Sequence, residues 1–189
     1  DEKPDVVFNT GDCVMDSMEQ DEARTLLQWE LWRKCIADGP RIPMEHCLGN
    51  HDIWGVNKKK SKTTGAEPKY GKKLACEMLG MEKPYRRFDR AGWSFVVLDS
   101  VLPLDGSYER RLDAEQMEWF KGELASIPKT TPVMILSHVP ILTVTPLADE
   151  KKAPEKAWSI PISRMMADWV DFRDLFRKHR NVKTCISGH

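Results

Sequence analysis

Side chains that can bind metal ions follow four apolar segments of the sequence, each directly after the segment ends. The segments are VVFNTG, CLG, VMILS and TCISG. Short apolar runs are typical of buried strands, and the parallel strands of an α/β sheet place their carboxyl ends at one edge. We therefore expect the residues after the four segments to meet in one site. In chain order these residues are Asp12, Asn50, His51, Asp52, His138 and His189.

Histidines are concentrated at these strand ends. Three of the five histidines stand there, while we interpret His46 as a strand residue and His179 as a helix-end residue. A single histidine is more often a satisfied core or surface residue than a ligand, but the set taken together favours ligands. Nitrogen and oxygen donors without a thiolate suit manganese, iron or zinc, and the sequence does not choose among the three.

The segments that must position these side chains alternate between strands and helices, which favours an α/β layered architecture. Apolar runs predict strands at 6–8, 43–48, 93–99, 133–137 and 182–187. A first helix is expected after a capping box at 17–20, a second from Asp113, and a third over about 163–179. The side chains expected to face the core are Leu27, Leu31, Cys35 and Ile36, then Met117, Phe120, Leu124 and Ile127, then Met166, Trp169, Val170 and Phe176.

The composition is that of an ordinary globular domain. With 189 residues, 41% of them hydrophobic, the chain can bury a substantial core, and we expect a single domain over residues 1–189. Lys plus Arg and Asp plus Glu each number 29, so no net field gathers the chain onto nucleic acid or an acidic membrane. No apolar run can span a bilayer, and no signal peptide opens the chain. Five cysteines without paired spacing indicate reduced thiols, which leaves the compartment open with a slight preference for the cytoplasm.

Two polar segments, 57–68 and 146–156, are interpreted as surface loops. The first carries the run Lys58 to Lys60 shortly after the candidate site residues. The alternative is that these lysines steer a phosphate toward the site.

The order of the four motifs resembles a known family. GD at 11–12, GNHD at 49–52, SHxP at 137–140 and GH at 188–189 are similar to the motifs of the calcineurin-like metallophosphoesterase superfamily. The resemblance implies an α/β fold, specifically a four-layer α/β/β/α sandwich, a centre of two metal ions, and hydrolysis of a phosphodiester or phosphomonoester. The stretch LDAEQMEWFKGEL at 112–124 is similar to a segment of the cyclic-nucleotide phosphodiesterase branch. The implied partner is a small phosphate ester such as a cyclic nucleotide, with no nucleic acid and no membrane.

The resemblance also implies a role for each candidate residue. The second metal ion would be bound by Asp12, Asn50, His138 and His189. Asp12 would in addition bridge the two ions. His51 would be the general acid that protonates the leaving alkoxide, and Asp52 would orient its imidazole. The nucleophile would be a water that bridges the ions and is ionised near neutral pH because the metals lower its pKa.

The sequence departs from the family pattern at both ends. No Asp-x-His motif precedes Gly11, and the last motif stops at His189 instead of continuing as GHxH. By resemblance both absences fall on the first metal ion, so we expect one metal site in this chain and a fold without its first strand and its C-terminal end. We interpret the chain as part of a longer protein, truncated at both ends. The alternative is a catalytically inactive domain or fragment that binds metal or phosphate and retains one metal site.

Overall fold

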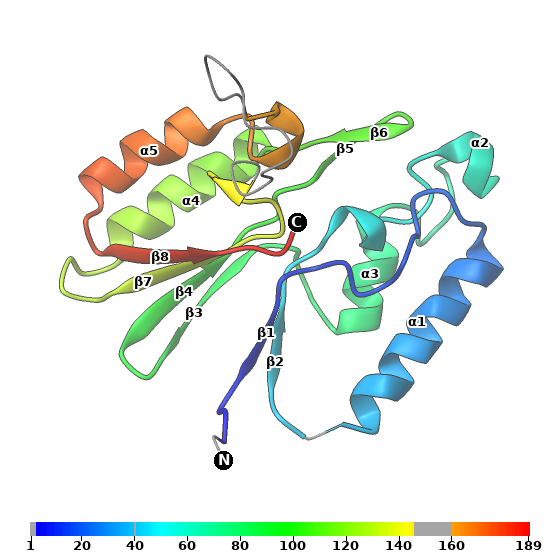
Figure 1. Cartoon of the computed structure of the whole chain (residues 1–189), viewed down its shortest axis with the longest axis horizontal. Coiled ribbons are helices and arrows are strands. Elements are labelled where there is room, and N and C mark those ends of the chain that lie inside the picture. The colour runs from blue at the N-terminus through cyan, green and yellow to red at the C-terminus, as the bar shows by residue number, and fades with distance from the viewer. Residues whose placement is uncertain (1–2, 40, 146–159) are drawn as a thin grey trace.

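The computed structural model describes residues 3–39, 41–145 and 160–189, and these residues form four layers (Figure 1). The elements in chain order are β1 (Val7–Asn9), α1 (Glu22–Ala37), β2 (Met44–His46), η1 (Asn50–Asp52), α2 (Lys58–Ser61), α3 (Lys72–Leu79), β3 (Arg86–Arg90), β4 (Trp93–Val97), β5 (Leu102–Leu104), β6 (Ser107–Glu109), α4 (Ala114–Ser126), β7 (Val133–Leu136), η4 (Ile162–Arg164), α5 (Trp169–Lys178) and β8 (Val182–Ile186). Helices α1 and α3 cover the sheet of β1 and β2, whereas α4 and α5 cover the sheet of β3, β4, β7 and β8. The predicted four-layer α/β/β/α fold is confirmed.

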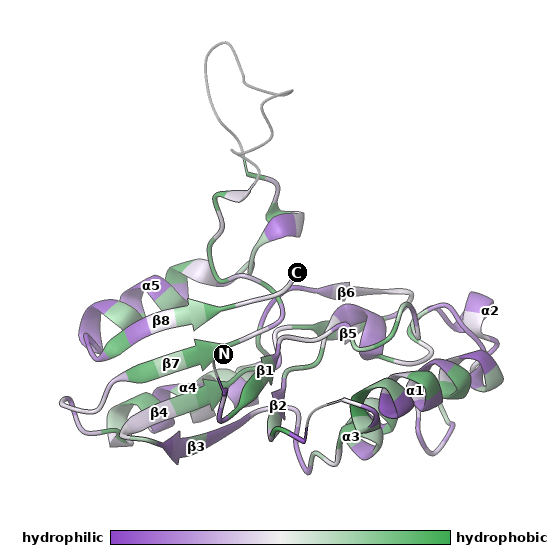
Figure 2. Ribbon diagram, turned by 60° about the horizontal axis from the view of Figure 1, so that its bottom comes forward, coloured by the Kyte–Doolittle hydropathy of each residue, from purple (hydrophilic) through white to green (hydrophobic). Residues whose placement is uncertain are grey.

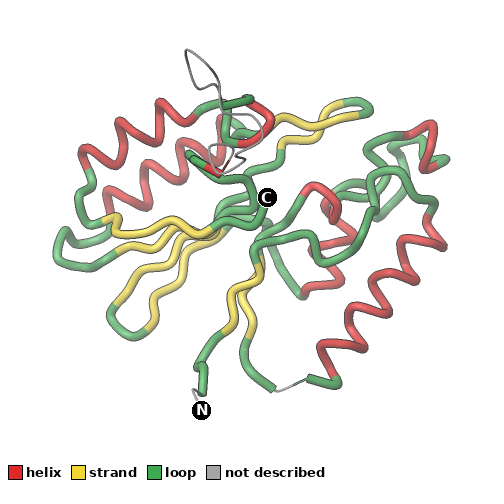
Figure 3. Tube along the Cα trace, in the orientation of Figure 1, coloured by secondary structure: helices red, strands yellow, loops and turns green. Residues whose placement is uncertain are grey.

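The two sheets bring the carboxyl ends of their parallel strands to the middle of the molecule. β1 pairs with β2 in parallel, and β4, β7 and β8 are parallel neighbours with β3 antiparallel at one edge. Figure 3 shows the loops that leave these strands converging near the point where the chain ends. All five predicted strands are present, with bounds within two residues of the predicted ones.

Apolar cores on both faces of the sheets hold the layers at a fixed spacing. Between the two sheets, Phe8 of β1 packs near Phe95 of β4, with ring centroids 5.3 Å apart. Along β4, Phe95 and Val97 face this core, whereas Val96 faces the core beneath α4 and α5. A strand buried on both faces appears in the sequence as a continuous apolar run, which is why β4 is predictable.

The strands that the sequence does not predict lie in two hairpins. β3 is the polar run RRFDR at the edge of its sheet, and β5 contains Pro103 (Figure 2). Charged residues and proline are common on edge strands, where one row of backbone groups has no neighbouring strand. A tight turn with φ of 50° at Ala91 and 79° at Gly92 joins β3 to β4. Turn residues therefore mark this hairpin better than apolar runs do.

The buried face of α1 is not the predicted one. Leu27 and Leu31 are 43% and 54% exposed, and Cys35 and Ile36 are also exposed, whereas Trp29 is fully buried. The helix has two apolar stripes, and the stripe with the tryptophan turns inward because its side chain removes more apolar surface from water. The predicted capping box at 17–20 is also wrong, since the carboxylate of Asp21 caps the helix.

The other two predicted helices are confirmed in part. α4 begins after Asp113 as predicted and directs its predicted stripe into the core, with Met117 partly buried. α5 begins only at Trp169, so Met166 is buried ahead of the helix, and Val170 is 40% exposed. Phe172 and Leu175 are the residues that α5 buries.

One of the two predicted surface loops contains a short helix, and the other lies outside the described residues. The segment 57–68 contains the short helix α2, while 146–156 lies outside the described residues. In α2, Lys58 and Lys60 form ion pairs with Asp105 and Glu19, which favours the interpretation of this segment as surface over phosphate steering. Across the described ranges, no helix has the length and apolar character needed to cross a membrane.

The orientation of α1 can be tested by comparing Trp29→Ala with Leu31→Ala. Trp29 is fully buried and Leu31 is largely exposed, so Trp29→Ala should lower the free energy of unfolding by about 4 kcal/mol. Leu31→Ala should change it by less than about 0.5 kcal/mol. Urea denaturation midpoints measure both values, and a larger loss for Leu31→Ala would show that the helix is turned the other way.

Candidate metal centre

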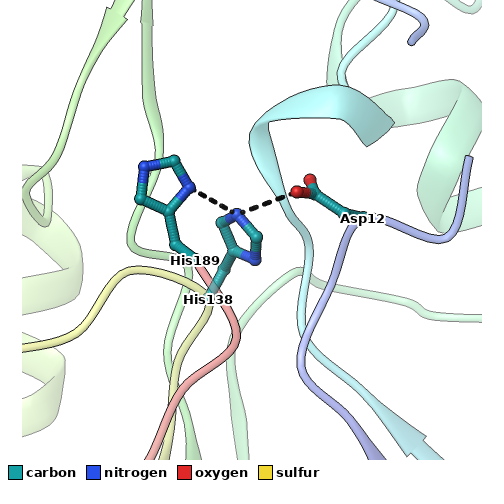
Figure 4. A group of neighbouring side chains, drawn as sticks. All are labelled: Asp12, His138 and His189. Atoms are coloured by element: carbon teal, nitrogen blue, oxygen red, sulfur yellow. Dashed lines mark hydrogen bonds and ion pairs between the residues drawn. The ribbon is translucent and has the colours of Figure 1, made fainter. Parts of the chain in front are cut away.

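Three metal-capable side chains meet between the two sheets. The ligand atoms of Asp12, His138 and His189 all lie within 4.8 Å of one another (Figure 4). His138 Nε2 lies 3.4 Å from Asp12 Oδ2, 3.1 Å from His189 Nδ1 and 3.1 Å from Asn50 Oδ1. The structure thus brings together all four residues that the sequence analysis assigned to one metal ion.

Each of these side chains comes from the carboxyl end of a parallel strand. Asp12 follows β1, Asn50 opens η1 after β2, His138 follows β7 and His189 follows β8. The His138 side chain is 1% exposed, whereas that of Asp12 is 34% exposed and His189 lies at the surface. The cluster therefore has a rigid inner wall and an outer side that a small molecule can reach.

The carboxylate of Asp52 holds the two loops that carry Asp12 and Asn50. Its Oδ2 accepts hydrogen bonds from the backbone N–H groups of Asp12 at 2.9 Å and Gly49 at 2.8 Å. Its Oδ1 accepts from Cys13 at 2.7 Å and Val14 at 3.3 Å. Successive amides that point at one anion form a concave site of this kind in many tight turns. Asp52 is fully buried, and these hydrogen bonds offset the free-energy cost of removing its carboxylate from water.

This contact pattern corrects the role predicted for Asp52. Its oxygens accept hydrogen bonds from backbone amides, and in the described part of the chain none goes to the His51 imidazole. The ring nitrogen His51 Nδ1 is buried without a hydrogen-bond partner among those residues. The backbone N–H of His51 instead donates to Asp12 Oδ1 at 3.1 Å, which helps to aim the Asp12 carboxylate. Asp52 is thus a scaffold residue and not the orienting partner of His51.

Glycines allow the loops to approach this closely. A Cβ on Gly49 would overlap the side chain of Asp12, and a Cβ on Gly11 would lie 2.5 Å from the Gly49 nitrogen. Gly11 has a φ of 97° and Asp12 one of 56°, a left-handed pair that glycine adopts freely and aspartate tolerates better than most residues. The GD and GNHD motifs therefore fit each other sterically as well as chemically.

The hydrogen bonds of His138 fix which of its nitrogens can bind a metal. Nδ1 lies 2.8 Å from the Thr10 carbonyl oxygen, which can only accept, so Nδ1 carries the proton. Nε2 then presents a lone pair toward the oxygens of Asn50 and Asp12, which are acceptors as well. Several lone pairs directed at one another repel unless a cation lies between them. The residues present therefore fit a bound metal ion, and a backbone carbonyl behind a ligating histidine is the usual supporting contact.

Burial favours the neutral form of both histidines, which is the form that binds a metal ion. Burial lowers the pKa of His138 most, while the Asp12 carboxylate acts in the opposite direction. Burial also lowers the pKa of His189, and the nearby His138 and Arg110 act in the same direction. For Asp52, burial is the largest effect and raises the pKa to about 7, although the amide donors favour the ionised form.

Sequence patterns did not reveal two contributors to this site. The Thr10 carbonyl that orients His138 has no side-chain signal, because every residue has a carbonyl group. Arg110 lies in the loop between β6 and α4, within electrostatic reach of His189. Its only sequence signal is its position two residues before the segment 112–124.

The role of Asp52 can be tested with Asp52→Asn. An amide in place of one carboxylate oxygen would direct N–H groups at two backbone donors, so the free energy of unfolding should fall by about 3 kcal/mol. The measurement is a urea denaturation curve at about pH 8, above the pKa of about 7, where the native carboxylate is charged.

Asp171→Asn, at an exposed position of α5, is the matched control and should change the stability by less than about 0.5 kcal/mol. Equal stabilities of the two variants would contradict the scaffold role of Asp52.

Comparison with known proteins places this arrangement in a family. The family model of calcineurin-like phosphoesterases matches residues 1–189. Among solved structures, a dimetal phosphatase from Danio rerio matches with a TM-score of 0.60 and 15% sequence identity, over 98% of this chain and 66% of that one. This similarity supports the fold, and the chain spans just under two thirds of that relative. No curated protein matches the sequence. The chain, with its Asp12, Asn50, His138 and His189 cluster at the strand ends, belongs to the calcineurin-like phosphoesterase family.

Proposed function

We propose that this chain is the metal-binding domain of an enzyme that hydrolyses phosphoric esters at a centre of two metal ions. The observation that carries the proposal is the convergence of Asp12, Asn50, His138 and His189, with the His138 tautomer fixed by a backbone carbonyl. Bound metal ions supply positive charge that offsets the charge of the phosphate and lower the pKa of water. Family membership supports the same reaction class.

The candidate ligands differ in burial and in charge. His138 and Asn50, both buried, provide a nitrogen and an amide oxygen from opposite sheets. Asp12 is more exposed and adds a negative charge, and by the family resemblance it would be the carboxylate shared by two ions. Neutral ligands beside a single carboxylate leave net positive charge at a loaded site, which an anionic ester needs.

His51 is the proposed general acid. Its backbone is fixed by the bond to Asp12 Oδ1 and by the Ser17 N–H, which donates to the His51 carbonyl at 2.8 Å. No carboxylate among the described residues holds its Nδ1. In this role the His51 ring would donate a proton to the leaving oxygen.

A second candidate function is metal or phosphate binding without turnover. The specific observation in its favour is that the described residues form one cluster of metal-capable groups, sufficient for one ion. Metal stoichiometry and turnover together separate the candidates, because the second predicts one bound ion and no hydrolysis.

The proposed substrate class is a small phosphate ester. The segment 112–124, which suggested a cyclic nucleotide, has a structural explanation: Gln116 bonds to both backbone groups of Asp99, and its apolar residues fill the core. A panel of a chromogenic phosphomonoester, a chromogenic phosphodiester and a cyclic nucleotide, with Mn²⁺ added, tests the three possibilities directly.

The catalytic role of His51 predicts a large loss of turnover with little loss of metal. His51→Ala should lower kcat by on the order of 100-fold or more, because a general acid contributes about that much, while the bound metal content stays the same. Steady-state kinetics on the best substrate of the panel and elemental analysis of the dialysed protein give the two values. Loss of metal along with activity would show that His51 is a ligand instead.

The ligand assignment predicts the opposite pattern for His138. His138→Ala should remove a buried donor and lower metal affinity by roughly 100-fold or more, as measured by titration of the apoprotein with Mn²⁺ or Zn²⁺. His179→Ala, at the end of α5, is the matched control and should leave the affinity unchanged. Identical titration curves for all three proteins would refute the site.

A further inference from the structure

Ser100 is a buried serine whose hydroxyl binds the backbone directly after His138. It lies in the loop that leaves β4, and its side chain is fully buried. The hydroxyl oxygen accepts a hydrogen bond from the Val139 N–H at 2.9 Å, and Val139 is fully buried as well. A buried N–H that loses its partner costs free energy, so this contact holds the two segments together.

The segment that carries Ser100 is held by both outer layers of the fold. Gln116 of α4 accepts a hydrogen bond from the Asp99 N–H at 2.9 Å and donates one to the Asp99 carbonyl at 3.0 Å. The buried carboxylate of Asp99 forms an ion pair with Lys72, the first residue of α3. Helices α3 and α4 lie on opposite sides of the two sheets (Figure 1). Ser100 is therefore an anchored point and not a loose loop residue.

The peptide unit between His138 and Val139 is bound at both of its polar groups. Its carbonyl, from His138, accepts hydrogen bonds from the N–H groups of Gly188 at 3.0 Å and His189 at 2.9 Å. Its N–H, from Val139, donates to Ser100. Because a peptide unit is planar, contacts at both groups fix the rotation of the whole unit. That rotation helps to set the direction in which the His138 side chain leaves the backbone.

We propose that Ser100 is a positioning residue for metal binding, which directs the His138 imidazole by holding the peptide unit that follows it. This inference rests on the proposed function, because it assumes that His138 binds a metal ion. The aim of the ring is narrow: Nδ1 lies 2.8 Å from the Thr10 carbonyl, and Nε2 lies 3.1 Å from Asn50 Oδ1. Metal sites need donor atoms held within about 0.5 Å, so a small rotation of the backbone would weaken binding.

The first test compares metal binding by Ser100→Ala and Ser94→Ala. Titration of the apoprotein with Mn²⁺ should show Kd raised by roughly 10-fold in Ser100→Ala, as is usual when a supporting contact behind a ligand is lost. Ser94 is the matched control, because it is equally buried and its hydroxyl binds Asp89 in the same hairpin, at the other end of β4. Ser94→Ala should leave Kd within about twofold. Equal losses in the two variants would overturn the proposal, because they would indicate a general effect of losing a buried hydroxyl.

The second test asks whether Ser100 acts through His138. In the His138→Ala background, Ser100→Ala should have no further effect on the Kd for Mn²⁺, since a positioning residue acts only through the residue it positions. Urea denaturation shows that each variant folds. The same loss of affinity in both backgrounds would contradict the positioning role.

A third measurement, on the metal-free protein, separates this inference from the proposed function. Long-range ¹H–¹⁵N spectra report which ring nitrogen of His138 carries the proton, and its signals are those absent from His138→Ala. The native ring should carry the proton on Nδ1, which faces the Thr10 carbonyl. Ser100→Ala should show a mixture of the two tautomers, whereas Ser94→Ala should match the native protein.

The combined outcomes decide each claim by itself. A mixed tautomer in Ser100→Ala, with no metal bound by the native chain, would support the positioning role of Ser100 and reject the metal site. Metal binding by the native chain, with the native Kd and the native tautomer in Ser100→Ala, would support the metal site and reject the role of Ser100.

Discussion

The arrangement of the candidate metal centre depends on one buried carboxylate that is not among the four predicted ligands. Asp52 accepts four backbone hydrogen bonds, three from the turn after β1 and one from Gly49 after β2. The turn contains a left-handed aspartate, which an unsupported chain would seldom adopt. By satisfying the amides of both loops at once, Asp52 fixes where the Asp12 and Asn50 side chains begin. The GNHD motif thus carries a candidate ligand, Asn50, and the carboxylate that aligns it with Asp12.

The centre lies at the seam between two sheets, and the packing of the sheets sets its dimensions. Asp12 and Asn50 come from one sheet, and His138 and His189 from the other. The inter-sheet core fixes the spacing of the sheets, and glycines at the loop tips permit the final close approach. A change in the volume of a core residue at this seam therefore moves donor atoms that are many residues away in sequence.

The sequence predicted structure best where polar motifs directly follow buried strands. It predicted less where tertiary contacts decide the placement of a side chain. The polar residues after apolar runs predicted which side chains cluster, because strand direction alone brings them to one edge. The contacts of Asp52 were misassigned because a sequence neighbour of a histidine looks like its partner, whereas backbone geometry directs the carboxylate elsewhere. The prediction of which face of α1 is buried was wrong, because the helix has two apolar stripes and only tertiary packing decides which of them faces the core. Arg110 has no motif at all, because its placement follows from a hairpin and a segment distant in sequence.

The candidate ligands come from both sheets, so a bound ion would link the two sheets mechanically. An ion held by Asp12 and His138 together ties one sheet to the other, and a shear between the sheets would pull its donor atoms apart. By thermodynamic linkage, whatever resists that shear raises the affinity for the ion, and the ion in turn raises the resistance to shear. The ring contact between Phe8 and Phe95 is then part of the energetics of metal binding, although neither ring touches the ion.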